Sequence, residues 1–477
     1  MTTQEKKIII ISFIVFVVAS IFSVGYHHFD EHFQILEFAG LKLNLTSAVN
    51  LPWEYHCQMR PAFQPFIAFC LYNFFGLFGL NNPFIIAFIF RLLSAVLTFY
   101  SIWLLYRVFK DQIHDTVLKK WYLILSFLLW FAIYNGVRFS SENWSGIAFI
   151  ITFSLFFIIQ KRNAIFFVCI GCGLGLTFLF RYQAGFLIMG FLLWMAFIKK
   201  EKVFNLLLIM FGLSLLIFIG ILIDHWFYGE WTISFWHYFE QNILQDKVSN
   251  FGVHPWWWYF EKFFMKGIPP FSLLFIISLF VLLIYRPKSP VLWSITPFLI
   301  VHFLIGHKEI RFLFPMICFL PIISILAMEA IQNKYIPKLT SSRFLQVFMK
   351  LFFIVNFIAL AIVSLQPADN QIPLYNSIYK NYKEPVTLYY INENPYKRVL
   401  DIYFYRRKNL SVNKIESLKD IDYKSNNKNL IVFTNRDIPL DFGKNHKLVY
   451  SSFPDYLLAF NFNNWLSRTK AWYVYEL

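Results

Sequence analysis

Long apolar runs recur along this chain, and they constrain its fold more than any other feature. IIIISFIVFVVASIFSV lies within the first 25 residues, and FIIAFIFRLLSAVLTFYSIWLLY follows Pro83. Of the 477 residues, 58% are hydrophobic and only 15% are charged, whereas about a quarter are charged in a soluble protein. Hydrocarbon offers the backbone no hydrogen-bonding partner, so a run of about 20 apolar residues crosses the bilayer as a helix. The sequence therefore predicts a polytopic α-helical membrane protein with about eleven transmembrane helices.

The formal net charge of +16 is concentrated in basic clusters between these runs. They begin with Lys6 and Lys7 and continue at Arg107–Lys120, Lys161–Arg162, Lys199–Lys202, Arg286–Lys288 and Lys334–Lys350. The positive-inside rule places such clusters in the cytoplasm, so the charge requires no nucleic-acid partner. The polar stretches that remain are then expected on the opposite, extracytoplasmic side: 26–62, 135–143, 181–184, 224–268 and 306–312. This alternation requires residues 63–80 to be a short re-entrant or interfacial piece.

The composition changes after Gln366, where the chain becomes polar. Runs of β-forming residues, VTLYYI, NLIVFT and KLVYSSF, are separated by turns rich in Asn and Lys. We therefore expect a transmembrane domain at 1–366, with a first extracytoplasmic loop at about 26–62, and a small extracytoplasmic α/β domain at 367–477.

The stretch GHKEIRFLFP places His307, Lys308, Glu309 and Arg311 between two apolar runs, at the expected mouth of two spans. A single Lys or Arg here would be explained by snorkelling to the interface. Clustered charge at membrane depth is costly and usually faces a cavity. Arg181 also has apolar residues on both sides and requires a partner such as an anion. These cations suit the phosphate of a lipid-linked substrate.

A pair of adjacent acids, Asp30 and Glu31, lies in the first loop among three histidines. Adjacent carboxylates repel each other, which can raise one pKa toward the value that suits a general base. A solvated loop is the simpler alternative. A metal site is conceivable from these residue types, but HHFDEH does not match a helical zinc spacing such as HExxH.

Aromatic residues accompany the polar groups of these loops. Trp53 and Glu54 could hold a sugar, or Trp53 could belong to an interfacial aromatic belt. The stretch from Asp224 to Phe260 is dense in aromatics and suits a helix lying in the membrane plane or a platform for a lipid tail and a sugar. Glu142 lies at the end of another apolar run.

Several stretches resemble glycosyltransferase family 22, whose members are mannosyltransferases that use a polyprenyl-phosphate mannose donor. HHFDEHFQ resembles the family's His-x-Asp-Glu-x-x-Gln, PWEYHCQMRPAFQP its Trp-Glu-Tyr followed by Arg and Pro, and HKEIRFLFP its His-Lys-Glu-x-Arg-Phe. DHWFYG and NFGVHPWWWYF are similar to two further motifs, and all five occur in the family's order between residues 27 and 315. They are similar to the glycosylphosphatidylinositol mannosyltransferase branch. Phe29, Pro61 and Phe251 depart from the family pattern.

The resemblance implies a GT-C membrane fold and an inverting transfer of mannose to a glycan or glycolipid acceptor with α linkage. Asp30 or Glu31 would take the acceptor proton, and His307, Lys308, Arg311 and Arg181 would bind the donor phosphate. The residues expected to contact substrate are Trp53, Glu54, Arg60, Glu142, Tyr228, His254 and Trp256. No metal is obligatory for this chemistry, although a divalent ion is compatible with it. The membrane would be the bacterial inner membrane or that of the endoplasmic reticulum, with the active site extracytoplasmic.

Two alternatives remain from the sequence. The chain could transfer another polyprenyl-phosphate-linked sugar, glucose or aminoarabinose. It could instead be a lipid or sugar transporter or flippase, which would also hold buried charges. No inverted repeat is evident, and long aromatic loops suit an enzyme better.

Overall fold

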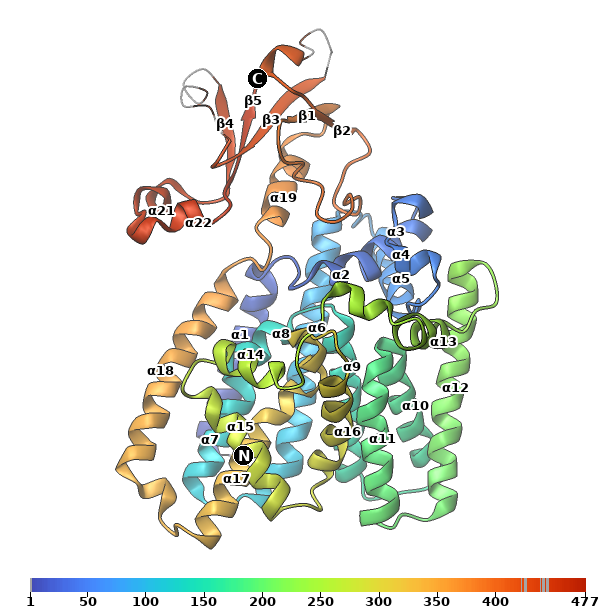
Figure 1. Cartoon of the computed structure of the whole chain (residues 1–477), viewed down its shortest axis with the longest axis vertical. Helices are drawn as coiled ribbons and strands as arrows, with labels where there is room; N and C mark the ends of the chain where they lie inside the picture. The colour runs from blue at the N-terminus through green and yellow to red at the C-terminus, as the bar shows by residue number, and fades with distance from the viewer. Residues whose placement is uncertain (1, 422, 424–426, 438, 440–441, 443–445) are drawn as a thin grey trace. The chain divides into compact units, whose positions relative to one another are not determined.

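The computed structural model describes residues 2–421, 423, 427–437, 439, 442 and 446–477. The chain divides into two compact units, each built from three segments (Figure 1). The first, here called the helical unit, comprises Met1–Ser23, Trp53–Ala68 and Phe88–Gln366. The second, the sheet-bearing unit, comprises Val24–Pro52, Phe69–Ala87 and Pro367–Leu477.

Long apolar helices make up most of the helical unit. Among the described residues, six segments are long and apolar enough to cross a membrane: Pro83–Gln112 (α6 and a 3₁₀ turn), Thr116–Gly136 (α7, Thr116–Leu128, and α8, Trp130–Gly136), Ser141–Ile158 (α9), Val203–Tyr228 (α12), Ile310–Lys334 (η8, Ile310–Phe319, and α17, Leu320–Lys334) and Arg343–Leu365 (α18). The chain is therefore a multi-pass membrane protein, as predicted.

Further apolar helices complete this unit. The helices α15 (Ser272–Tyr285) and α16 (Pro290–Leu304) form a pair bent by 118°, which counts as a seventh span if the pair is one span. The remaining ones are α1 (Thr3–Phe22), α10 (Ala164–Phe180) and α11 (Gly185–Leu193) with the π-helix that continues it to Ile198. The described residues thus contain eleven apolar helical segments: the six long ones, the two arms of the bent pair and these three. The crossing of the bilayer by each one stays a prediction.

Helix α5 (Phe63–Gly76) has 14 residues, or about 21 Å at the α-helical rise. That length is shorter than the hydrocarbon core of a bilayer, about 30 Å. The re-entrant or interfacial position expected for this piece stays a prediction.

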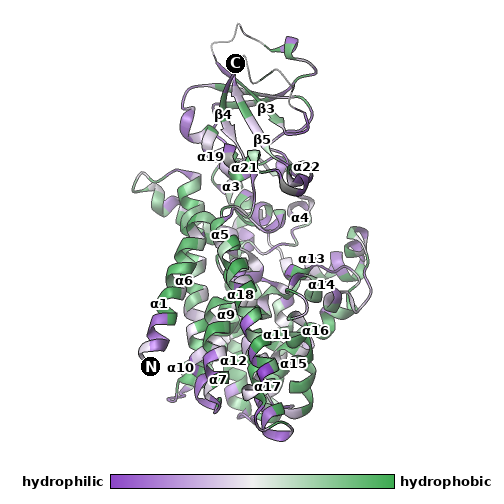
Figure 2. Cartoon of the chain, turned by 90° about the vertical axis from the view of Figure 1, so that its left-hand side faces the viewer, coloured by the Kyte–Doolittle hydropathy of each residue, from purple (hydrophilic) through white to green (hydrophobic). Residues whose placement is uncertain are grey.

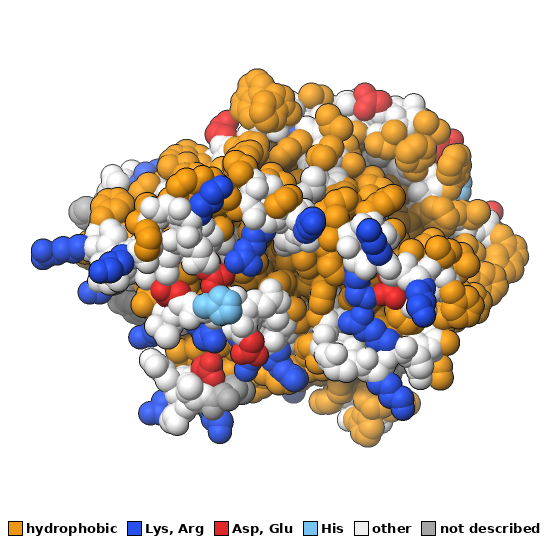
Figure 3. Space-filling model, turned by 90° about the horizontal axis from the view of Figure 1, so that it is seen from below, with side chains coloured by type: hydrophobic (Ala, Val, Ile, Leu, Met, Phe, Trp, Pro, Cys, Tyr) orange, Lys and Arg blue, Asp and Glu red, His pale blue; other side chains and the backbone are white. Residues whose placement is uncertain are grey.

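Three of the basic clusters share one end of the helical unit. Figure 1 shows the turns between α11 and α12, α15 and α16, and α17 and α18 at the lower end, and these turns carry three of the basic clusters. Apolar residues cover the helices along most of their length (Figure 2), and Lys and Arg side chains spread over the face seen from below (Figure 3). This distribution is the one that the positive-inside rule requires of a single cytoplasmic face.

Two glycines allow α10 and α12 to approach each other closely. A Cβ at Gly171 would lie 2.0 Å from the carbonyl oxygen of Ile209, and one at Gly212 would lie 2.2 Å from that of Val168. In membranes such small residues let helix backbones come into van der Waals contact, which replaces the missing hydrophobic driving force.

The sheet-bearing unit contains a mixed five-stranded sheet of order β2-β1-β3-β5-β4. Its strands are β1 (Val386–Tyr390), β2 (Leu410–Lys414), β3 (Lys428–Thr434), β4 (Lys447–Ser451) and β5 (Trp472–Glu476). β1 runs parallel to β2 and β3, whereas β5 runs antiparallel to β3 and β4. Helix α19 (Gln371–Asn381) precedes the sheet, and the first-loop elements α2 (Phe29–Glu31), the π-helix η1 (His32–Glu37) and α3 (Phe38–Lys42) belong to the same unit. The three strand runs read from the sequence are β1, β3 and β4.

We predict that Gly212→Val forces α10 and α12 apart and lowers the free energy of unfolding by about 3 kcal/mol, the upper range for overpacking. Thermal unfolding in detergent measures the effect. Gly185→Ala is the control, because its nearest neighbour is the Phe178 ring at 3.3 Å, which can move. Equal melting temperatures for the two variants would contradict the close packing.

Candidate active site

Two buried arginines share one carboxylate at an end of the helical unit. Glu142 lies in the first turn of α9, Arg181 at the C-cap of α10 and Arg311 in the first turn of η8. Arg181 Nη1 donates to Glu142 Oε1 at 2.9 Å, and Arg311 Nη1 donates to the same oxygen at 3.2 Å. Arg181 also donates to Ser141 Oγ at 3.1 Å. The structure thus brings together three residues that the sequence placed in separate loops.

Glu309 extends this network to His307. Its carboxylate accepts from Arg311 Nε at 2.5 Å and Nη2 at 3.1 Å, and from His307 Nε2 at 3.1 Å. The hydrogen bond to Glu309 raises the pKa of His307. His307 Nδ1 lies 3.1 Å from the carbonyl oxygen of Gly252, so both ring nitrogens face acceptors, the arrangement that an imidazolium satisfies. Two arginines and His307 thus share two glutamates at this end of the helical unit.

Lys308 makes a different set of contacts. Its ammonium donates to the backbone carbonyl oxygens of Phe303 (2.9 Å), His302 (3.3 Å) and Ile305 at the end of α16. The residue is 2% exposed, and burial lowers its pKa. A cation on the last carbonyls of a helix completes their hydrogen bonding and matches the helix dipole. Lys308 is therefore a C-terminal cap of α16, a role that the sequence analysis missed.

An acidic residue in α12 fixes the loop that carries Trp53, Glu54 and Arg60. Asp224 Oδ1 accepts from Ala62 N at 2.8 Å, and Oδ2 accepts from Ser234 Oγ at 2.6 Å. Tyr228, one turn further along α12, donates to the carbonyl oxygen of Arg60 at 2.7 Å. Asp224 was not among the expected site residues, although an acid within an apolar run of this length was the available signal.

Within this loop, Arg60 Nη2 lies 3.5 Å from Glu54 Oε1, and the Arg60 guanidinium lies 5.6 Å from the centre of the Tyr238 ring. The ring of Trp53 stacks against Phe251, with ring centres 6.2 Å apart. Loop 53–62 thus contacts both the end of α12 and the aromatic segment that follows it.

The segment at 252–258 pairs with the GHKEIRF stretch. His254 N donates to the carbonyl oxygen of Gly306 at 2.9 Å, and the His254 ring stacks on Trp258 with ring centres 4.9 Å apart. Trp256 is 59% exposed. A large exposed indole offers a surface for an apolar chain or a sugar ring.

The acid pair lies in the sheet-bearing unit. Glu31 is buried and its Oε2 accepts from His27 N at 3.2 Å, whereas the Asp30 side chain is 16% exposed and lies 3.6 Å from His28 Nδ1. Among the described residues, no group of three His, Cys, Asp or Glu side chains has the arrangement of a metal site.

A buried glutamate joins the first loop to the C-terminal segment of the same unit. Glu37 Oε1 accepts from the backbone N–H groups of Tyr403 and Phe404, both at 2.9 Å, and from His32 Nε2 at 2.8 Å. The π-helical turn spaces His32 and Glu37 five residues apart on one side, and π-helical turns frequently occur at functional sites. The acid pair immediately precedes this turn.

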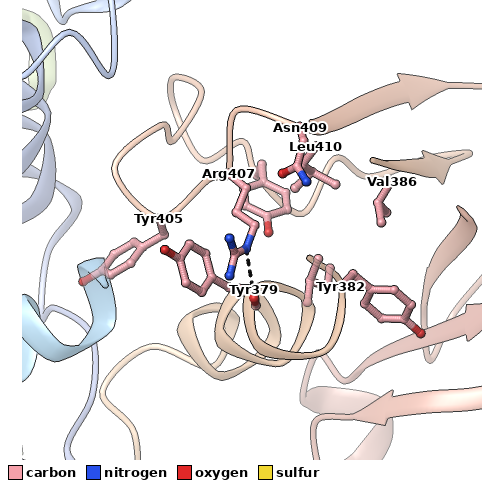
Figure 4. A pocket seen from close by; sticks show the side chains of 9 residues that line it. Tyr379, Tyr382, Val386, Tyr405, Arg407, Asn409 and Leu410 are labelled. Atoms are coloured by element: carbon pink, nitrogen blue, oxygen red, sulfur yellow. Dashed lines mark hydrogen bonds between the residues drawn. The ribbon is translucent and has the colours of Figure 1, made fainter. Parts of the chain in front are cut away.

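The hollow beside α19 in the sheet-bearing unit is largely filled by its own side chains. Arg407 Nε donates to the carbonyl oxygen of Tyr379 at 3.0 Å, and its guanidinium lies 3.8 Å from the centre of the Tyr379 ring (Figure 4). The space that remains is about 10 Å³, close to the volume that one water molecule requires and too small for a sugar.

Comparison with known proteins identifies the family. A sequence model of the Alg9-like mannosyltransferase family matches residues 8–407. The chain belongs to this family. It is 27% identical over 302 residues to GPI alpha-1,2-mannosyltransferase 3 of Bos taurus, a match covering 61% of this chain and 53% of the relative. It is 28% identical over 307 residues to GPI mannosyltransferase 3 of Drosophila melanogaster, covering 63% and 52%. The chain spans about half the length of the curated relatives it matches.

A solved structure supports the fold. The crystal structure of ArnT from Cupriavidus metallidurans bound to undecaprenyl phosphate superposes with a TM-score of 0.56 and 11% identity, covering 99% of this chain and 98% of ArnT. At this identity the likeness concerns the fold alone, which is the GT-C fold. The family and fold inferred from the sequence motifs are both confirmed.

We predict that Glu37→Leu lowers the free energy of local opening of the Tyr403–Phe404 segment by about 2 kcal/mol, because two backbone donors lose a charged acceptor. Hydrogen exchange of a peptide covering 400–407 measures the change. Glu384→Leu, at an exposed position of the same unit, is the control. If exchange in this peptide is equally slow in both variants, Glu37 does not hold the segment.

Proposed function

We propose that this protein transfers mannose from a polyprenyl-phosphate-mannose donor to a hydroxyl group of a glycan or glycolipid acceptor, with α linkage. The observation that carries the proposal is the match of the Alg9-like mannosyltransferase family over residues 8–407. The acceptor oxygen attacks the anomeric carbon, the bond from that carbon to the phosphate oxygen breaks, and the polyprenyl phosphate leaves with the electron pair. A β-linked donor then gives an α-mannoside by inversion.

In this proposal Arg181, Arg311 and His307 bind the donor phosphate. The leaving phosphate gains a negative charge as its bond to the sugar breaks, and fixed cations in a site of low dielectric stabilise that charge without reorganising. Glu142 and Glu309 hold the two guanidinium groups in place. The two guanidinium groups, with His307 beside them, support an anion as the ligand. For Lys308, the three carbonyl contacts support capping of α16, with the ammonium adding its charge to the field of the site.

In this proposal one residue of the acid pair is the general base of the reaction. We propose that Asp30 takes the proton of the acceptor hydroxyl, because its side chain is the more exposed of the two, and that Glu31 fixes the loop through His27 N. The aromatic and polar residues Trp53, Glu54, Arg60, Tyr228, His254 and Trp256 would form the contacts to the sugars and the polyprenyl chain. No step of this reaction requires a metal ion.

The basic turns indicate the orientation in the membrane. We propose that these turns face the cytoplasm and that the GHKEIRF end of the helical unit faces the extracytoplasmic side. The membrane would be the bacterial inner membrane or that of the endoplasmic reticulum, where polyprenyl-phosphate-linked sugars are available.

The deciding experiment measures transfer of labelled mannose from polyprenyl-phosphate-mannose by the purified protein in lipid. We expect Asp30→Asn to lower the rate by about 10²–10⁴-fold, the usual contribution of a general base. Asp111→Asn, at an exposed position in a turn of the helical unit, is the control. A wild-type protein that transfers no mannose would refute the proposed function. Unchanged transfer by both Asp30→Asn and Glu31→Gln would refute the role of the acid pair.

A matched pair of variants separates phosphate binding from helix capping. Arg311→Lys keeps the charge but loses the planar fork, so we expect turnover at saturating donor to fall about a hundredfold with little loss of fold. Lys308→Met removes the cap of α16, so we expect a lower melting temperature with turnover per folded molecule reduced less than in Arg311→Lys. Near-wild-type turnover in Arg311→Lys would make the network purely structural. A hundredfold loss in well-folded Lys308→Met would make Lys308 a phosphate ligand.

A further inference from the structure

A polar hollow lies at the N-terminal end of α1, among the first turn of α1, the last turn of α6 and the first two turns of α7. Its volume is about 130 Å³. The polar side chains that line it include Thr2, Glu5, Tyr106, Thr116, Lys119 and Lys120. All of them belong to the helical unit.

The hollow is distant from the arginine network. The segment Thr116–Gly136 begins at the hollow and has 21 residues, or about 30 Å of helix, and Glu142 follows shortly after its far end. The hollow therefore lies at the end of the unit that carries the basic turns, and the transfer reaction proposed above does not use it.

Charges of opposite sign are arranged on its walls. The Glu5 carboxylate is fixed, because it accepts from Thr2 N at 2.7 Å and from the hydroxyl of Tyr106 at 3.0 Å. Lys119 and Lys120 follow each other in α7, and among the described residues neither ammonium group has an ion-pair partner. Two lysines and one oriented carboxylate, which Lys110 also approaches, surround this hollow. This set matches a ligand with a phosphate and an ammonium group.

We propose that this hollow binds the headgroup of a phospholipid that carries a primary ammonium group, as phosphatidylethanolamine does. Lys119 and Lys120 would bind the phosphate, with Thr116 as a neutral donor, and Glu5 would accept from the ammonium. Basic pockets between transmembrane helices on the cytoplasmic side are where lipid headgroups are recognised. The carboxylate adds selectivity, because a choline headgroup has no N–H to donate and a glycerol headgroup has no positive charge.

Native mass spectrometry of the full-length protein, titrated with equal amounts of single phospholipids, tests the assignment. We expect phosphatidylethanolamine to bind about tenfold more tightly than phosphatidylcholine or phosphatidylglycerol, the value of one charge-assisted hydrogen bond. The double substitution Lys119→Gln and Lys120→Gln is expected to lower the affinity for phosphatidylethanolamine about thirtyfold. Lys200→Gln with Lys202→Gln, two exposed lysines in another basic turn, is the matched control.

Glu5→Gln gives an independent readout, because the amide oxygen can keep the hydrogen bond from the Tyr106 hydroxyl, whereas the negative charge and the second acceptor, which serves Thr2 N, are lost. We expect this variant to bind phosphatidylethanolamine and phosphatidylglycerol equally, with the affinity for the second unchanged or higher. Equal affinity of the wild-type protein for phosphatidylethanolamine and phosphatidylcholine would overturn the proposal. The proposal would also be overturned if the Lys119 and Lys120 substitutions had no larger effect than the control substitutions. Binding of soluble phosphoethanolamine as tightly as the lipid would likewise overturn it.

Discussion

One oxygen atom, Glu142 Oε1, accepts from two buried guanidinium groups, and the arrangement of this end of the helical unit depends on it. A buried charge that loses its partner costs several kcal/mol, so three helix ends must meet where this carboxylate lies. The attraction of both guanidinium groups to this carboxylate also offsets the electrostatic repulsion between Arg181 and Arg311. In the proposed function, the site for the anionic donor phosphate thus exists before the ligand arrives.

Cations at the ends of two helices also stabilise the helical unit, because they satisfy backbone carbonyl groups there. Lys308 covers the last carbonyls of α16, and Arg138 donates through Nη1 to the carbonyl oxygen of Ser23, the C-cap residue of α1, at 2.7 Å. Both cations satisfy backbone groups that lipid cannot hydrate. Charged residues near a membrane surface therefore serve two purposes, and the residue type alone does not separate them.

The sequence allowed the membrane class, the family and three of the five strands to be predicted, because long apolar runs and ordered motifs are local signals. β2 and β5 were missed: LSVNK is short and half polar, and WYVYE is the last stretch of the chain. The arginine network could be predicted only in part. His307, Glu309 and Arg311 lie within five consecutive residues, whereas Glu142 and Arg181 join them through tertiary packing. Lys308 shows the reverse, since its position within a motif suggested a ligand and its contacts are those of a cap.

The bond between Glu37 and Tyr403 spans 366 residues of sequence. A ribosome that adds about 5–20 residues per second needs roughly 20–70 s to synthesise that interval. During this time the first loop has left the ribosome without the two backbone donors that pair with the Glu37 carboxylate. The order of synthesis therefore makes the acid pair one of the last parts of the protein to reach its final surroundings, after most of the membrane helices have been made.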